Sequence, residues 1–105
     1  MRKIDLSNYG VEVETQEGKK NIPYNVKGSL VDGLYHPDLR LGSRELFEND
    51  RVAQKINSSE GYVLLEEADY QKLKLAFDTI KGFRKEDVEL VKRVIEAPEV
   101  EVQEK

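Results

Sequence analysis

The sequence has no cysteine, no tryptophan and one histidine among its 105 residues. The lack of cysteine excludes a disulfide framework, a cysteine-ligated zinc or iron–sulfur site and a thiol nucleophile. No apolar run approaches the ~18 residues that a membrane span needs, and the N-terminal residues lack the apolar stretch of a signal peptide. We therefore expect a cytoplasmic protein with no cofactor and no membrane contact.

The sequence also lacks a strong excess of either charge. Acids outnumber bases 21 to 17, which gives a formal charge of -4. Proteins that bind nucleic acid usually carry a basic run or face that neutralises phosphates, and this chain has no such run, so nucleic acid is not the expected partner. At this length we expect one domain, residues 1–97, followed by an acidic tail, residues 98–105.

Alternating residues near the N-terminus predict a β-hairpin. The apolar residues of 9–13 alternate with glycine or glutamate, and those of 22–26 repeat the pattern. Gly18 suits the turn between them, and Pro23 favours an edge position for its strand. The earlier Ile4 and Leu6 belong either to the first strand or to a separate short one.

Apolar residues at helical spacing predict helices over about 27–35 and from an N-cap at Ser43 to about 57. Residues 62–65 predict a strand or the start of a buried helix. Two further helices, about 70–80 and 88–95, are separated by Gly82 as a C-terminal cap and a short link. We expect an α+β fold: an N-terminal β-hairpin packed on helices, ending in a C-terminal antiparallel αα-hairpin that presses on the hairpin sheet.

The tail alternates between glutamate and valine over residues 99–102. It is either a frayed end, which we favour, or a strand added to an exposed edge in the same chain or in a neighbouring one. The alternation alone is compatible with both.

His36 and Asp38 are the one place where a histidine and a carboxylate come close in the sequence. A histidine can act as a general base when a carboxylate, here Asp32 or Asp38, orients its ring. A small hydrolase centred on His36 is therefore one hypothesis. A histidine before a proline is also an ordinary place for a helix to stop, and no nucleophile pattern accompanies the pair. We therefore expect no catalytic residue.

Two acidic groups have the chemistry of a calcium or magnesium site. The first is interleaved with Arg44 and Arg51, which pair with it across a helix turn. The second lies at an expected helix N-terminus, where acids complement the dipole, and neither has the spacing of a calcium-binding loop. We expect no metal site in these groups: Glu45, Glu48 and Asp50; Glu66, Glu67 and Asp69.

Apolar residues at turns and chain ends remain as candidates for an interaction surface. Some flank the Pro37 turn, one follows a helix-ending glycine, and two lie in the tail. The alternative is that they make local contacts that seal the core. The residues are Tyr35, Leu39, Leu41, Phe83, Val100 and Val102.

The layout resembles that of small accessory proteins encoded by tailed phages and prophages. The resemblance rests on the hairpin over 11–26, the helix at Ser43, and the segment 87–94 before Ala97-Pro98-Glu99. It implies a non-catalytic role in virion or tail assembly, or in modulating a host protein, in the host cytoplasm or the virion. It identifies no site residue.

These observations favour a protein–protein interaction or assembly factor that is not an enzyme, has a protein partner and forms a homo-oligomer as one of its states. The alternative is a nucleic-acid-associated regulator whose phosphate-facing patch is Arg84, Lys85, Lys92 and Arg93. Acids at the start of the last helix argue against a helix that reads DNA there.

Overall fold

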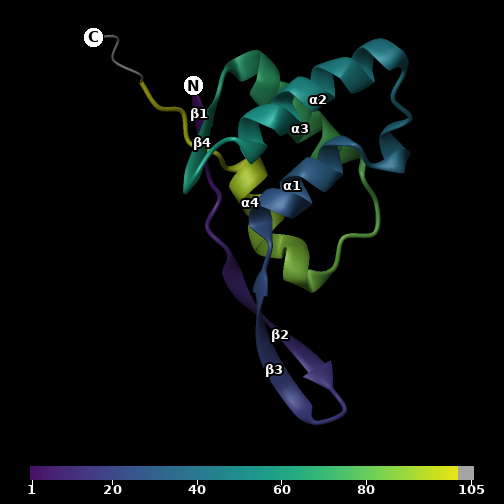
Figure 1. Ribbon diagram of the computed structural model, residues 1–105, viewed down its shortest axis with the longest axis vertical. Helices are drawn as coiled ribbons and strands as arrows, with labels where there is room; N and C mark the ends of the chain where they lie inside the picture. The colour runs from purple at the N-terminus through teal and green to yellow at the C-terminus, as the bar shows by residue number, and fades with distance from the viewer. Residues whose placement is uncertain (102–105) are drawn as a thin grey trace.

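The computed structural model describes residues 1–101 and has the α+β fold class that the sequence predicts. We use the name body for β1, β4 and the helices, and the name arm for the β2–β3 hairpin (Figure 1). In chain order the elements are β1 (Arg2–Asp5), β2 (Tyr9–Thr15), β3 (Gly18–Tyr24), α1 (Val26–Leu34), η1 (Pro37–Leu39), α2 (Ser43–Asn57), β4 (Tyr62–Leu65), α3 (Glu67–Thr79), η2 (Lys85–Asp87) and α4 (Val88–Ile95).

The body contains a small sheet that joins two distant parts of the chain. β1 and β4 pair antiparallel, with Ile4 opposite Val63, and both side chains are buried. The residues around Ile4 therefore form a separate strand rather than an extension of the hairpin. The strand interpretation of residues 62–65 is confirmed as β4.

The first tail residues lie along the other edge of β1. Glu99 forms a β-bridge with Arg2, and the Val100 amide donates to the Met1 carbonyl at 2.7 Å. The expectation of a frayed end is wrong for residues 98–100, because they pair with a strand of the same chain. Val102, the other valine expected to contribute to an interaction surface, lies outside the described residues.

The core lies between the β1–β4 sheet and the helices. Tyr70 is buried within it, and its hydroxyl donates to the Val94 carbonyl at 2.7 Å. Burying apolar side chains from every layer supplies the main driving force for this fold. The other members of the core are Ile4, Leu6, Val26, Leu30, Leu34, Val52, Ala53, Ile56, Val63, Leu65, Leu73, Ala76, Phe77, Leu90, Val94 and Ala97.

Helix α1 lies close against α2 and α3. A Cβ atom on Gly33 would come within 2.7 Å of Cε1 of Phe77 in α3, so only glycine permits this approach. From α2, the Asn49 amide donates to the Leu34 carbonyl at 2.9 Å, and Asn49 is the one polar side chain buried within residues 1–101. It satisfies a carbonyl at the end of α1 that the helix leaves unpaired.

Two predicted helix boundaries differ from the structure. The N-cap of α2 is Gly42, and Ser43 is already the first helical residue. Helix α3 ends with Ile80 as its C-cap in extended conformation, whereas Gly82, at φ 90°, lies in the link that follows. The glycine thus turns the chain after the helix instead of capping it.

The last two helices contact each other through the core. Tyr70, near the start of α3, also bonds the Ile95 carbonyl at the end of α4 at 3.2 Å, a contact that an antiparallel pair would make. We expected these two helices to press on the hairpin sheet. This expectation is wrong except at the base of the arm, because the buried side chains of α3 and α4 pack with β1 and β4. Only Tyr9 and Tyr24 of the arm pack against the core.

Candidate functional site

The arm stands away from the helices at one end of the molecule (Figure 1). Its strands pair from Tyr9 opposite Tyr24 to Thr15 opposite Gly18, and Gly18 at φ 113° follows the tight turn. No residue of either strand is fully buried. Within residues 1–101, neither strand pairs with any strand outside the arm, so both outer edges are open.

The alternation along the arm separates an apolar face from a polar one. Ile22, on the apolar face, is 43% exposed, whereas most large aliphatic side chains of the body are buried. Leaving such a side chain in water forgoes the free energy of burial. The apolar face bears the half-buried Val11 and Val13 and the exposed Ile22, with Lys20 opposite Val13. The polar face bears Glu12, Glu14, Lys19 and Asn21.

Two tyrosines attach the base of the arm to the body. The rings of Tyr9 and Tyr24 stack with centroids 4.7 Å apart and an interplanar angle of 10°. The Tyr9 hydroxyl donates to the Glu86 carbonyl at 2.7 Å, and the Tyr24 hydroxyl donates to the Asp87 carboxylate. Each strand of the arm is thereby bonded to η2.

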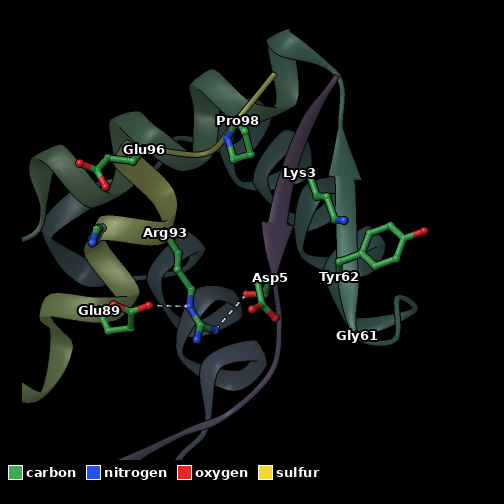
Figure 2. A pocket seen from close by; sticks show the side chains of 9 residues that line it. Lys3, Asp5, Gly61, Tyr62, Glu89, Arg93, Glu96 and Pro98 are labelled. Carbon is green, nitrogen blue, oxygen red and sulfur yellow. Dashed lines mark hydrogen bonds and ion pairs between the residues drawn. The ribbon is translucent and has the colours of Figure 1, made fainter. Parts of the chain in front are cut away.

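Arg93 of α4 braces the same junction. Its guanidinium donates to the carbonyls of Asp5 at 3.2 Å and Ser7 at 2.6 Å, in the link that leads into the arm. It also lies 5.3 Å from the Tyr9 ring centroid and bonds Glu89 at 3.3 Å. Figure 2 shows the side chain reaching from α4 between Glu89 and Asp5.

Proton equilibria at the junction follow from these contacts. Burial raises the pKa of Tyr24 well above its usual value, and the hydrogen bond to Asp87 raises this pKa further. Burial also raises the pKa of Tyr9. The second carboxylate oxygen of Asp87 accepts the Arg84 amide at 2.8 Å, so Asp87 holds both the arm and the start of η2.

Charge divides between the two strands. Glu12 and Glu14 lie on β2, whereas Lys19 and Lys20 lie on β3. Glu12 pairs with Lys19 at 3.6 Å, and Lys20 pairs with Glu17 of the turn at 3.6 Å. The side chains of these pairs are more than half exposed, so the pairs contribute little to stability.

A hollow of about 520 Å³ lies between the β1–β4 sheet and α4 (Figure 2). Lys3 lies over the Tyr62 ring, 4.6 Å from its centroid, and Arg93 is held by the bonds described above. Acids and bases of similar number line the hollow. Its walls therefore carry no net preference for one ligand charge.

His36 lines a second hollow, of about 260 Å³, together with Ser29 and Asp32. Its Nδ1 accepts the Asp38 amide at 3.1 Å and caps η1, so the ring serves the turn after α1. Asp38 in turn accepts the Lys81 amide at 3.0 Å. Within residues 1–101, no hydrogen bond joins His36 to Ser29 or Asp32. His36 Nδ1 also lies 3.7 Å from a carboxylate oxygen of Asp38, so both residues belong to the turn that follows α1.

In each acidic group some carboxylates bond bases from other elements, and within residues 1–101 neither Arg44 nor Arg51 makes the ion pair across a helix turn that we expected for the first group. Glu48 bonds Lys72 at 2.8 Å, and Asp69 bonds Lys55 at 2.5 Å. In the second group, the hydrogen bond from Arg2 is the main cause that lowers the pKa of Glu67. Among residues 1–101, no three metal-ligating side chains come together.

The apolar residues expected around the Pro37 turn divide between two places. The Tyr35 hydroxyl donates to Asp50 of α2 at 2.5 Å, which ties the end of α1 to that helix. Leu39 and Leu41 line a hollow of about 130 Å³ together with Leu75 of α3. The Tyr35 bond to α2 and the Leu39 packing against the core show that these residues also make local contacts.

The other residues expected at the interface are dispersed. Phe83 stacks on Phe77, with ring centroids 5.6 Å apart, and is 39% exposed. Val100 pairs with Met1 beside β1. The structure therefore brings Leu39 and Leu41 together and places Phe83 and Val100 elsewhere.

Sequence reasoning missed the apolar face of the arm. The alternation over residues 9–13 and 22–26 was a sufficient signal for the hairpin, but we took its apolar side to be core. It also missed two exposed side chains of the body, Phe47 at 66% and Leu75 at 67%. Helical spacing places Phe47 with the buried positions of α2, although the structure exposes it.

The bases expected to face phosphates do not act as one patch. The Arg93 side chain is 15% exposed and bonds backbone carbonyls, whereas Arg84, Lys85 and Lys92 are exposed. A phosphate-binding face needs its cations directed at solvent. Recruiting Arg93 to phosphate would break the brace at the base of the arm.

Comparison with protein families, curated proteins and solved structures finds no match to this chain. Within residues 1–101, no helix combines the length and the apolar character that crossing a membrane requires. The function must therefore be argued from the arm, the hollows and the charges themselves.

Proposed function

We propose that the protein is a non-catalytic protein-binding or assembly module and that the arm is the element that contacts its partner. The observation that carries the proposal is the exposed apolar face of the arm, on a hairpin whose base is bonded to η2 and braced by α4. A role in virion or tail assembly, as the resemblance implies, belongs to the same proposal.

The mechanics of the arm support this function. A two-stranded hairpin is marginally stable alone in water. In this protein three side chains hold the base of the hairpin. Tyr9, Tyr24 and Arg93 fix the direction in which the strands leave the body. A fixed direction reduces the conformational entropy that is lost when a partner binds.

The chemistry of the hollows supports the non-catalytic part. The single histidine caps a turn, and in the two acidic groups Glu48, Glu67 and Asp69 form ion pairs with bases. A catalytic site needs a nucleophile within hydrogen-bond reach of a base beside an open cavity, and His36, although it lines a hollow, bonds neither Ser29 nor Asp32 within residues 1–101. The proposal therefore assigns binding rather than turnover.

A selection from a displayed random peptide library tests the proposal. The full chain is the target, and the counter-target is a shortened-arm variant in which Asn-Gly replaces residues 12–21. In the shortened arm, Val11 and Ile22, which are register partners, close a new two-residue turn. We expect peptides that bind the full chain and lose affinity for the shortened arm by about a hundredfold or more, as loss of a central binding element predicts.

A control variant keeps the arm and changes the body surface. Leu75→Ala removes the most exposed large hydrophobic side chain of α3 and should leave peptide affinity unchanged. The proposal would be overturned by peptides that bind the shortened-arm variant as tightly as the full chain. Peptides whose affinity falls in Leu75→Ala instead would overturn it too.

A further inference from the structure

The two edges of the arm differ in their free backbone groups. Thr15 and Gly18 flank the two-residue turn and form a hydrogen-bonded pair, after which bonded and non-bonded pairs alternate along the ladder. Residues 10, 12 and 14 of β2 therefore direct their N–H and C=O groups outward. On β3 the outward residues are 19, 21 and 23, and Pro23 has no N–H.

A strand that approaches the arm thus finds a complete row of donors and acceptors on β2 only. Proline on the outward side of β3 is a known way to blunt an edge against pairing. The β2 edge has no such feature among its outward residues, Gly10, Glu12 and Glu14. Addition of a strand is therefore favoured on β2.

The side chains of β2 define what the added strand should contain. A neighbouring strand would lie beside Val11 and Val13 on one face and beside Glu12 and Glu14 on the other. Glu12 is 63% exposed and is met from the β3 side by Lys19. Within residues 1–101, no ion pair holds Glu14.

We infer that the arm binds an extended protein segment in which Lys or Arg alternates with apolar residues, and that this segment pairs with the outer edge of β2. Its apolar side chains continue the Val11–Val13 face, and its bases lie opposite Glu12 and Glu14. This inference rests on the proposed function of the arm. It adds which edge of the arm binds and what the chemistry of the bound segment is. The mode is strand addition, in which the main chain supplies affinity and alternate side chains supply specificity.

A second copy of this chain suits the β2 edge less well. Antiparallel pairing of two β2 strands about Glu12 would place this carboxylate opposite its equivalent, and like charges directly opposite each other destabilise a sheet. Pairing of β2 with β3 of another copy would bring acids to bases, but it would meet Pro23.

Two proline variants test the edge. Glu12 and Asn21 are register partners, so each carries an outward N–H at the same level of the arm, on opposite edges. The probe is a dye-labelled peptide of sequence Thr-Lys-Val-Lys-Val-Lys-Val-Thr with blocked ends, and its anisotropy is measured with the full chain. Glu12→Pro removes the outward N–H and the carboxylate together, so we expect it to lower affinity more than the about tenfold that one lost hydrogen bond would cost. We expect Asn21→Pro to leave the affinity unchanged.

A third variant separates backbone from charge. Glu12→Gln keeps the N–H and removes the carboxylate, so we expect an affinity between those of the wild type and Glu12→Pro. Equal losses for Glu12→Pro and Asn21→Pro, or no loss for either, would overturn the assignment to β2. Circular dichroism on each variant confirms that the body is folded in every comparison.

The charge requirement has its own test. The wild type should prefer the lysine peptide to a version with glutamate in place of lysine, and the double variant Glu12→Lys/Glu14→Lys should reverse the preference. Equal binding of both peptides by the wild type would overturn the basic partner.

The remaining outcomes distinguish this inference from the proposed function. If selected peptides require the arm but tolerate Glu12→Pro, the edge assignment fails and the binding function stands. If size-exclusion chromatography with light scattering shows a dimer of the free chain that Glu12→Pro dissociates, the partner is a second copy and the heterologous basic segment is wrong. If no peptide depends on the arm, both fail.

Discussion

The molecule contains two antiparallel strand pairs that differ in how far their side chains are buried. β1 and β4 are four residues long each and lie against helices, so Ile4, Val63 and Leu65 are buried. β2 and β3 are seven residues long each, yet none of their residues is fully buried. A strand pair becomes part of the core only when another layer covers a face, and the arm instead depends on bonds at its base.

The largest effect should come from removing a core side chain of the body. Leu73→Ala leaves a cavity in place of a fully buried side chain and should lower the free energy of unfolding by about 2–5 kcal/mol. Val13→Ala on the arm should change it by less than about 0.5 kcal/mol, because the site is half open to water. Urea denaturation measures both, and similar losses would contradict the division into body and arm.

High pH should weaken the protein through its tyrosines. Burial raises the pKa of Tyr9, Tyr24 and Tyr70 above the unfolded value. Stability from these hydroxyls is therefore complete below about pH 10 and declines as the pH rises toward the folded pKa values.

Tyrosinate absorbance and melting temperature between about pH 9 and 12 measure this decline. Tyr24→Phe should reduce the pH dependence because it removes one of the shifted groups. Tyrosines that ionise as they do in urea-unfolded protein would contradict the junction described for the base of the arm.

A smaller effect should come from loosening the junction itself. Tyr24→Phe keeps the ring stack but removes the donor to Asp87, at a cost of about 1 kcal/mol. Amide exchange should then accelerate in the arm more than in the body. Tyr62→Phe is the matched control, since within residues 1–101 the half-exposed Tyr62 hydroxyl bonds no protein group. Uniform acceleration across the chain would count against a junction that acts on the arm.

Shortening the arm should also have a small effect on stability. Replacing residues 12–21 by Asn-Gly removes exposed side chains and keeps the tyrosine junction, so the free energy of unfolding should change by less than about 1 kcal/mol. A loss comparable to that of Leu73→Ala would show that the arm is a structural element, and the comparison with β1–β4 would fail.

Local patterns predicted most of the elements. Periodicity over residues 43–57 and 88–95 reproduces α2 and α4, because amphipathic spacing is a property of neighbouring residues. The pairing of β1 with β4 joins residues about sixty positions apart, and nothing in either segment specifies its partner. The alternation of residues 9–13 predicted a strand with one apolar face, but it does not say whether another layer covers that face.

The candidate site was harder to predict for the same reason. The alternative hypothesis from the sequence placed Arg93 in a phosphate-facing patch, whereas in the structure its guanidinium donates to the carbonyls of Asp5 and Ser7. Its role depends on contacts that arise only when α4 meets the entry to the arm. Tyr9 and Tyr24 were assigned to the hairpin, but their bonds to η2 are equally non-local.

Amide hydrogen exchange of the full chain, with and without a peptide selected against it, tests the central claim most directly. If the arm is the binding element, the peptide should slow exchange at the outward amides of Gly10, Glu12 and Glu14 and leave the amides of α2 and α3 unchanged. Protection that appears in the body while the exchange of these three amides stays the same would contradict the account.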